Sequence, residues 1–160
     1  MEHSEICEVL YKACKNGNMS ELYTITEHLQ MEYVLSEKNN AFLSACSHGH
    51  LEVAKWLVDT FGLTVEDVKC SNNWAFRHAC RYGHLEVAES LVDKYELTLT
   101  DIRCCCNYAF RCACENGCLE VAKWLVDKFG LTSEDARSED NPAFRYACYY
   151  GHLELSLIHI

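Results

Sequence analysis

The amino-acid sequence predicts an all-α fold of the solenoid type, in which similar helical units stack one after another. A spacing of 34 residues separates matching phenylalanines, cysteines and glycines: Phe42, Phe76, Phe110 and Phe144; Cys46, Cys80, Cys114 and Cys148; Gly49, Gly83, Gly117 and Gly151. A fixed period of this size is the signature of stacked repeats. Apolar stripes with helical spacing lie on both sides of each glycine, which predicts two helices per unit.

The period divides the chain into units. Residues 1–38 form a divergent N-terminal capping unit, residues 39–72, 73–106 and 107–140 form regular units, and residues 141–154 form part of another. End units commonly differ because one of their faces meets water. Residues 155–160 break the pattern, and they read as the translation of a common sequencing adapter. We therefore expect an artefact tail here, on an array that is truncated at its C-terminal end.

Local signals place the helices within a unit. An asparagine begins each unit after the first, at Asn39, Asn73, Asn107 and Asn141. Because Asn is a strong N-cap, we expect a short first helix to start there and to end at the glycine. In the third unit the second helix is expected from Leu85 to about Lys94. Thr64 and Asp67 resemble a capping box, which predicts a short third helical turn at residues 65–68, 99–102 and 133–136.

Composition excludes some classes of function. The net charge of −10 argues against binding to nucleic acid, which depends on clustered Lys and Arg. No apolar run is long enough to span a membrane, and we find no secretory signal. The cysteines that recur with the period are therefore expected to be free, buried thiols in a cytoplasmic monomer.

One segment of the unit resembles a known family. Residues 79–88 read Ala-Cys-Arg-Tyr-Gly-His-Leu-Glu-Val-Ala, and copies begin at Ala45, Ala113 and Ala147. This is similar to the ankyrin-repeat segment Ala-Ala-x-x-Gly-His-Leu-Glu-Val-Val. Tetratricopeptide repeats share the period but have a Trp-x-x-Leu-Gly pattern that is absent here. In this chain Trp-Ala-Phe-Arg, at residues 74–77, replaces the family's Thr-Pro-Leu-His, and Leu-Thr-x-x-Asp replaces its hairpin segment.

The resemblance implies a scaffold that binds a protein partner through the concave face of the first helices. The acidic charge favours a basic partner. First-helix positions that differ between units are candidates for contact, because Tyr, Trp and Arg dominate interface energies. These candidate residues are Trp74, His78, Arg81, Tyr82, Tyr108, Cys112, Glu115, Asn116, Tyr146, Tyr149 and Tyr150. The alternative is that they only decorate a solvated face or fill gaps between units.

Two further ladders have structural interpretations. Arg77, Arg111 and Arg145 either contact an acidic partner or brace neighbouring units, and we favour bracing toward Asp67, Asp101 or Asp135. His50, His84 and His152 follow the glycines and are expected to cap the second helix or to bond a loop carbonyl, while Cys118 replaces the histidine in one unit.

A cluster of cysteines offers a different function. Cys104, Cys105 and Cys106, with Cys112, Cys114 and Cys118, suggest a zinc or redox-sensing site. No paired Cys-x2-Cys motif supports metal binding, and exposed members of the triplet are candidate reactive thiols instead. No catalytic, phosphate-binding or cofactor motif is present, so we expect no enzymatic activity, no cofactor and no metal. A remaining alternative is the targeting arm of a larger enzyme.

Overall fold

The computed structural model describes residues 3–26, 41–132, 135, 145 and 148–151. Its elements are helices, and no strand occurs among these residues. The first unit contributes α1 (His3–Asn16) and α2 (Met19–Thr26), and the second contributes a helical stretch at residues 41–47 and α4 (Leu51–Phe61). The remaining helices are α5 (Val65–Arg81), α6 (Leu85–Tyr95), α7 (Leu99–Ile102), α8 (Cys104–Glu115) and α9 (Leu119–Phe129).

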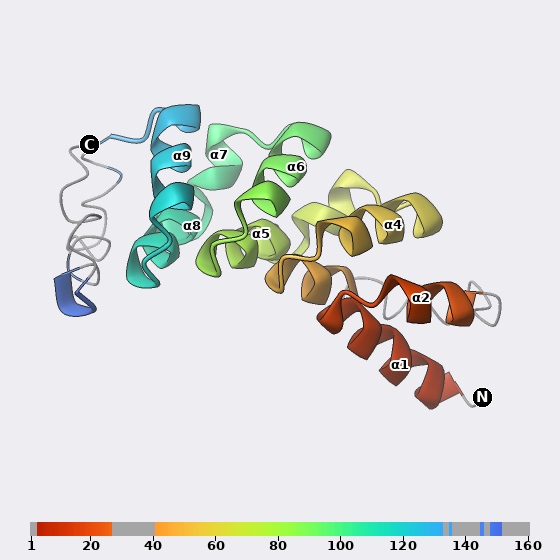
Figure 1. Ribbon diagram of the computed structural model, residues 1–160. Helices are drawn as coiled ribbons and strands as arrows, with labels where there is room; N and C mark the ends of the chain where they lie inside the picture. Colours follow the sequence, from red (N-terminus) through yellow and green to blue (C-terminus); the bar gives the residue numbers. More distant parts are fainter. Residues whose placement is uncertain (1–2, 27–40, 133–134, 136–144, 146–147, 152–160) are drawn as a thin grey trace.

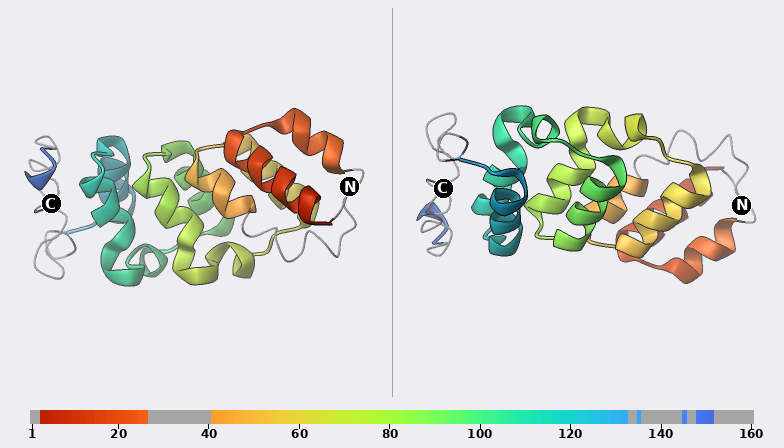
Figure 2. Two further views of the ribbon diagram at one scale, coloured as in Figure 1. Left: turned by 90° about the horizontal axis from the view of Figure 1, so that it is seen from below. Right: turned by 90° about the horizontal axis from the view of Figure 1, so that it is seen from above.

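The units stack in sequence order, as a solenoid requires. The first helices α1, α5 and α8 follow one another along one side of the array, and the second helices α2, α4, α6 and α9 follow along the other (Figures 1 and 2). Each first helix packs on the second helix of its own unit, and α5 also packs on α8 of the next unit. The predicted all-α repeat architecture is therefore confirmed.

One apolar core runs through the described units. Phe42, Phe76 and Phe110 are each at most 2% exposed, and all three belong to the same continuous cluster of buried side chains. The cysteines of the same repeat, Cys46, Cys80 and Cys114, are also buried. Cys148, which the period places in the core, is instead exposed, and most of the residues around it in the sequence lie outside the described ones.

The predicted capping box is present. The backbone N–H of Asp67 donates to the Thr64 hydroxyl at 3.3 Å, and the Thr64 N–H donates to the Asp67 carboxylate at 2.9 Å. The copy at Thr98 and Asp101 begins α7, the separate helical turn predicted for residues 99–102. Residues 65–68 are helical too, but they run on into α5. Most of the third predicted turn, at residues 133–136, lies outside the described residues.

Asn73 and Asn107 are not N-caps, contrary to the prediction, and Asn39 and Asn141 lie outside the described residues. Asn73 and Asn107 are buried and adopt left-handed backbone conformations, with φ of 60° and 57°. Asn is one of the few residues that tolerates this conformation. The Asn73 side-chain N–H2 donates to the Asp101 carbonyl at 3.2 Å, and Asn107 donates likewise to the Asp135 carbonyl. The amide thus bonds the far end of its own unit instead of capping its helix.

The histidines after the glycines bind the preceding unit. His50 Nε2 donates to the Lys15 carbonyl at 2.9 Å, and His84 Nε2 donates to the Ser47 carbonyl at 3.0 Å. A carbonyl only accepts, so Nε2 carries the proton in both rings. The predicted carbonyl acceptor is present, but it belongs to the last turn of the preceding unit's first helix and not to a loop, and neither histidine makes a side-chain cap of its helix.

Ion pairs also join consecutive units, but Arg77 does not take part in them. Lys69 pairs with Asp101 at 2.9 Å, and Arg103 pairs with Asp135 at 2.7 Å. Arg77 instead donates from Nη1 to the Cys105 Sγ atom at 3.1 Å. The predicted pairing of Arg77 with an aspartate is not found, and Asp101 and Asp135 pair with Lys69 and Arg103 instead.

No helix among the described residues is long and apolar enough to cross a membrane. The predicted tail at residues 155–160 lies outside the part of the chain that the structure describes, as do the predicted unit start at Asn141 and the fourth core phenylalanine, Phe144.

Candidate recognition surface

Three ring side chains, two on α5 and one at its C-cap, form a continuous row, in which the first two rings are stacked and the third is tilted. Trp74 and His78 lie nearly parallel, with ring centroids 3.6 Å apart, and the His78 and Tyr82 centroids are 5.8 Å apart. The residues are spaced by four, which places them on the same face of a helix. His78 and Tyr82 therefore lie on the same face of the helix as Trp74.

Tyr108 from α8 joins this row of rings across the boundary between two units, through contacts with two arginines. The Arg77 guanidinium lies 4.4 Å from the centre of the Tyr108 ring, and Arg81 Nη1 donates to the Tyr108 hydroxyl at 3.0 Å. Arg81 also lies 5.7 Å from the centre of the Tyr82 ring. We call Trp74, Arg77, His78, Arg81, Tyr82 and Tyr108 the aromatic–arginine cluster.

The positive charge of this cluster comes from its arginines. Burial and the neighbouring Arg81 and Arg77 lower the pKa of His78, so its ring is neutral at pH 7. Burial and the Cys112 thiol raise the pKa of Tyr108, although its hydrogen bond from Arg81 acts in the opposite direction. Tyr108 therefore remains a neutral phenol that accepts from Arg81.

The predicted contact residues differ in exposure. Tyr82, Tyr149 and Tyr150 are 51%, 81% and 52% exposed, and Tyr149 and Tyr150 form an edge-on pair with centroids 5.0 Å apart. Asn116 is exposed, while the side chains that are half-buried are Trp74, His78, Arg81, Tyr108 and Glu115. Cys112 is only 3% exposed, so it offers no surface, and Tyr146 lies outside the described residues.

Arg77 is the cluster member that the prediction of contact residues left out. Arginine recurs at this position with the period of 34, at Arg77, Arg111 and Arg145, and this recurrence favours a structural role. The available signal was its spacing: Arg77 and Arg81 are four residues apart, so they share a face.

The cysteine cluster does not come together as a metal site. Cys112 and Cys114 are buried, and no group of three His, Cys, Asp or Glu side chains suited to a metal occurs in the described part of the chain. The side chain of Cys106 is not described. Cys104 and Cys105 do converge, with their Sγ atoms 3.4 Å apart.

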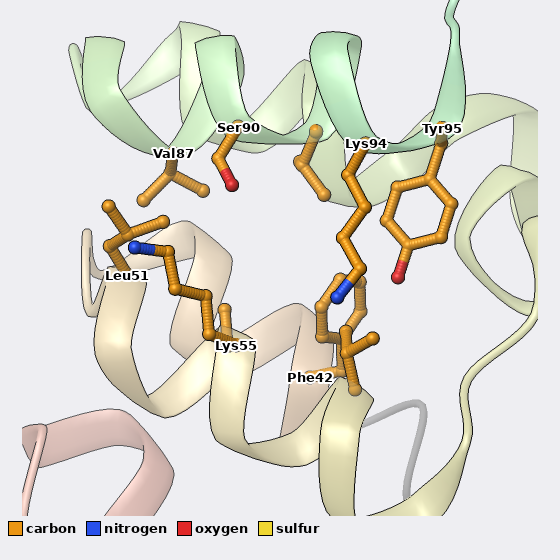
Figure 3. A pocket seen from close by; sticks show the side chains of 10 residues that line it. Phe42, Leu51, Lys55, Val87, Ser90, Lys94 and Tyr95 are labelled. Atoms are coloured by element: carbon orange, nitrogen blue, oxygen red, sulfur yellow. The ribbon is translucent and has the colours of Figure 1, made fainter.

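A small cavity lies on the opposite side, between α4 and α6 (Figure 3). Leu51, Lys55, Val87 and Lys94 line it, and the Tyr95 hydroxyl points into it (Figure 3). Its volume of about 20 Å³ is room for about one water, far below that of a ligand pocket. The Tyr95 hydroxyl is buried without a protein partner, and burial raises the pKa of Tyr95 to about 12. The cavity therefore suits a water molecule and not a ligand.

These features define a class: a helical repeat array whose first helices carry a varied aromatic surface. Comparison with family models matches residues 10–101 to ankyrin repeats (3 copies) and residues 110–156 to ankyrin repeats (many copies). The first match alone spans more than half of the chain. The chain belongs to the ankyrin repeat family, whose members are generally protein–protein interaction modules.

Solved structures show the same fold. The chain is similar to the X-ray structure of an ankyrin repeat family protein from Legionella pneumophila, with a TM-score of 0.68 and 23% sequence identity. The alignment covers 97% of this chain but only 46% of that one. No curated protein matches the sequence.

Proposed function

We propose that this protein binds a protein partner through the first-helix face, with the aromatic–arginine cluster at the centre of the contact. Tyr149, Tyr150, Glu115 and Asn116 surround or extend that centre. The array is a scaffold without catalytic activity of its own.

The cluster itself is the observation that supports this proposal. Its rings and guanidinium groups are already held in place by one another, so little conformational entropy is lost when a partner binds. Aromatic residues and Arg are also the residues that contribute most to interface energies. A face that only decorates the scaffold would not need side chains arranged across two units.

The chemistry of the cluster favours a partner that offers a carboxylate beside an apolar side chain. Arg77 and Arg81 present positive charge, and the rings of Trp74 and Tyr82 present apolar surface. The net charge of −10 favours basic partners at long range, but the contact itself depends on the groups that the partner meets. The exposed carboxylates Glu86, Asp93 and Glu120 belong to the second helices, on the other side of the array.

A comparison of captured proteins tests the binding face. The variant Tyr82→Ala/Tyr149→Ala removes two side chains that are 51% and 81% exposed, so it should fold normally. Tyr23→Ala is the control, because this tyrosine belongs to the second helix α2 and is 57% exposed. Proximity labelling in cells, quantified by mass spectrometry, should show partners that the first variant loses and the control retains.

The size of the effect can be stated. Loss of two interface tyrosines should weaken binding by about 2–4 kcal/mol, or at least about 30-fold. An identical set of partners for the wild type, the variant and the control would show that the proposed face is wrong.

A further inference from the structure

Two adjacent thiols meet at the start of α8. Cys104 is half-buried, Cys105 is exposed, and their Sγ atoms are 3.4 Å apart. Neighbouring residues of a regular helix do not face each other. The convergence of these two side chains therefore needs a local cause.

The cause is an unusual backbone conformation that Arg77 supports. Cys105 has a φ of 54°, in the left-handed region that a residue with a side chain adopts rarely. Arg77, from α5, donates from Nη1 to the Cys105 Sγ atom at 3.1 Å. The Arg77 Nε atom is buried without a partner, so the sulfur is one of the few groups that satisfy this guanidinium.

The repeat does not require this pair. The positions of Cys104 and Cys105 are occupied one period earlier by Cys70 and Ser71, and one period later by Ser138 and Glu139. The adjacent cysteines are therefore a feature of one unit and not of the scaffold. Strained backbone that a neighbouring side chain holds in place is common at functional sites.

We propose that Cys104 and Cys105 form a vicinal dithiol site that binds a soft trivalent centre, with trivalent arsenic as the representative ligand. Soft centres prefer thiolate ligands, and two sulfurs in contact can hold one atom without moving the backbone. With an organoarsenic oxide, R–As=O, two As–S bonds form and the arsenic–oxygen bond breaks. The two thiol protons leave with the oxygen as one water molecule, and the oxidation state of arsenic is unchanged.

The other described thiols do not offer such a pair. Cys46 and Cys80 are fully buried, and burial raises the pKa of both, so they are inert. Cys148 is exposed but has no cysteine beside it in the sequence. Cys148 is therefore a suitable internal control, because it can bind arsenic through one sulfur only.

Retention of phenylarsine oxide in the presence of a competing monothiol tests the site. The reduced full-length chain receives one equivalent of the compound, excess 2-mercaptoethanol is added, and intact mass is followed over time. The second sulfur acts at a high effective concentration, so loss should be at least about tenfold slower from a dithiol than from a single thiol. Wild type and Cys148→Ser should keep one arsenical, whereas Cys104→Ser and Cys105→Ser should lose it rapidly.

Cys106→Ser separates this pair from the third cysteine of the triplet, and it should behave like the wild type. Circular dichroism of each variant shows whether the fold is kept. Rapid loss from the wild type would overturn the proposal, as would rapid loss from Cys106→Ser combined with retention by Cys104→Ser. Neither readout depends on a protein partner, so this result is independent of the proposed binding face.

Discussion

The left-handed glycine between the two helices of a unit is also a contact between units. Gly49 has a φ of 78°, and a Cβ atom there would lie 2.5 Å from Nδ1 of the His84 ring. That ring cannot move freely, because its Nε2 is bonded to the Ser47 carbonyl. Gly62 has a similar φ of 60°, but a Cβ atom there would meet nothing within 4 Å.

Alanine substitution at these two glycines separates backbone strain from steric clash. Gly62→Ala should lower the free energy of unfolding by about 1–2 kcal/mol, the penalty of a left-handed residue. Gly49→Ala should lower it by about 2–4 kcal/mol, because the clash with His84 is added. Urea denaturation of both variants measures the difference. Equal losses would mean that the His84 ring does not pack on Gly49 as described.

His84 makes stability depend on pH. Burial lowers its pKa, more than the hydrogen bond to Ser47 raises it, and His48 and His50 lower it further. The pKa in the folded chain therefore lies below the unfolded value of about 6.5, so the unfolded chain binds the proton first. The stabilisation is complete above about pH 6.5 and is lost as the pH falls through the folded pKa.

We expect the free energy of unfolding to fall between about pH 7 and pH 5, and to fall less in His84→Gln. His78, whose pKa is also lowered, remains in both proteins and contributes equally to both. Thermal denaturation across this range provides the measurement. The same pH dependence in both proteins would exclude His84 as the titrating group.

Residue-scale interactions could be predicted only in part. A histidine ring N–H needs an acceptor, so a carbonyl was one of two expected partners, but the sequence did not show that it belongs to the first helix of the preceding unit. Asn73 was ambiguous, because Asn favours both an N-cap and the left-handed region. The residues beside Asn73 do not include the Asp101 carbonyl, which lies 28 positions further along the same unit and decides between these roles.

At the scale of the element, one aspartate both binds the backbone of its own unit and joins two units. The Asp135 carboxylate accepts the Thr132 N–H at 2.9 Å and is paired with Arg103 through two nitrogens, at 2.7 and 2.8 Å. Burial would raise the pKa of Asp135, but the hydrogen bonds from Arg103 and Thr132 outweigh burial and lower it. The side chain is only 9% exposed, compared with 19% for Asp101, which pairs with Lys69 instead.

Replacing these two aspartates should therefore have unequal effects. Asp135→Ala leaves Arg103 and the Thr132 N–H without their acceptor and should cost about 2–4 kcal/mol of stability. Asp101→Ala removes a more exposed pair with Lys69 and should cost about 1–2 kcal/mol. Chemical denaturation of the two variants gives the comparison, and a larger loss for Asp101→Ala would refute this account of the inter-unit pairs.

The capping boxes could be read from the sequence because Thr and Asp interact within one turn of the chain. The ion pairs between units could not be assigned in the same way, since they depend on the register of one unit against another. A signal was nevertheless present: Lys69, Arg103 and Arg137 also recur with the period of 34. The predicted bracing between units involved Arg77 instead, whereas Arg77 contacts Cys105 and Tyr108 in the structure.

At the scale of the whole molecule, the array depends on phenylalanines that are shared between units. Phe42, Phe76 and Phe110 belong to one buried cluster together with the leucines of the second helices. The period alone predicted this arrangement, because only buried positions need to recur so regularly. The recognition surface was less predictable: the positions that vary between units could be identified, but their stacking and exposure could not.

The central claim is that neighbouring units stabilise one another through this shared core and so hold the aromatic–arginine cluster rigid. Urea unfolding of Phe76→Ala, followed by circular dichroism and by tryptophan fluorescence, tests it most directly. We expect one cooperative transition in both signals, with a loss of about 3–5 kcal/mol relative to the wild type. A loss below about 1 kcal/mol, or a variant in which only one signal shifts, would contradict the claim.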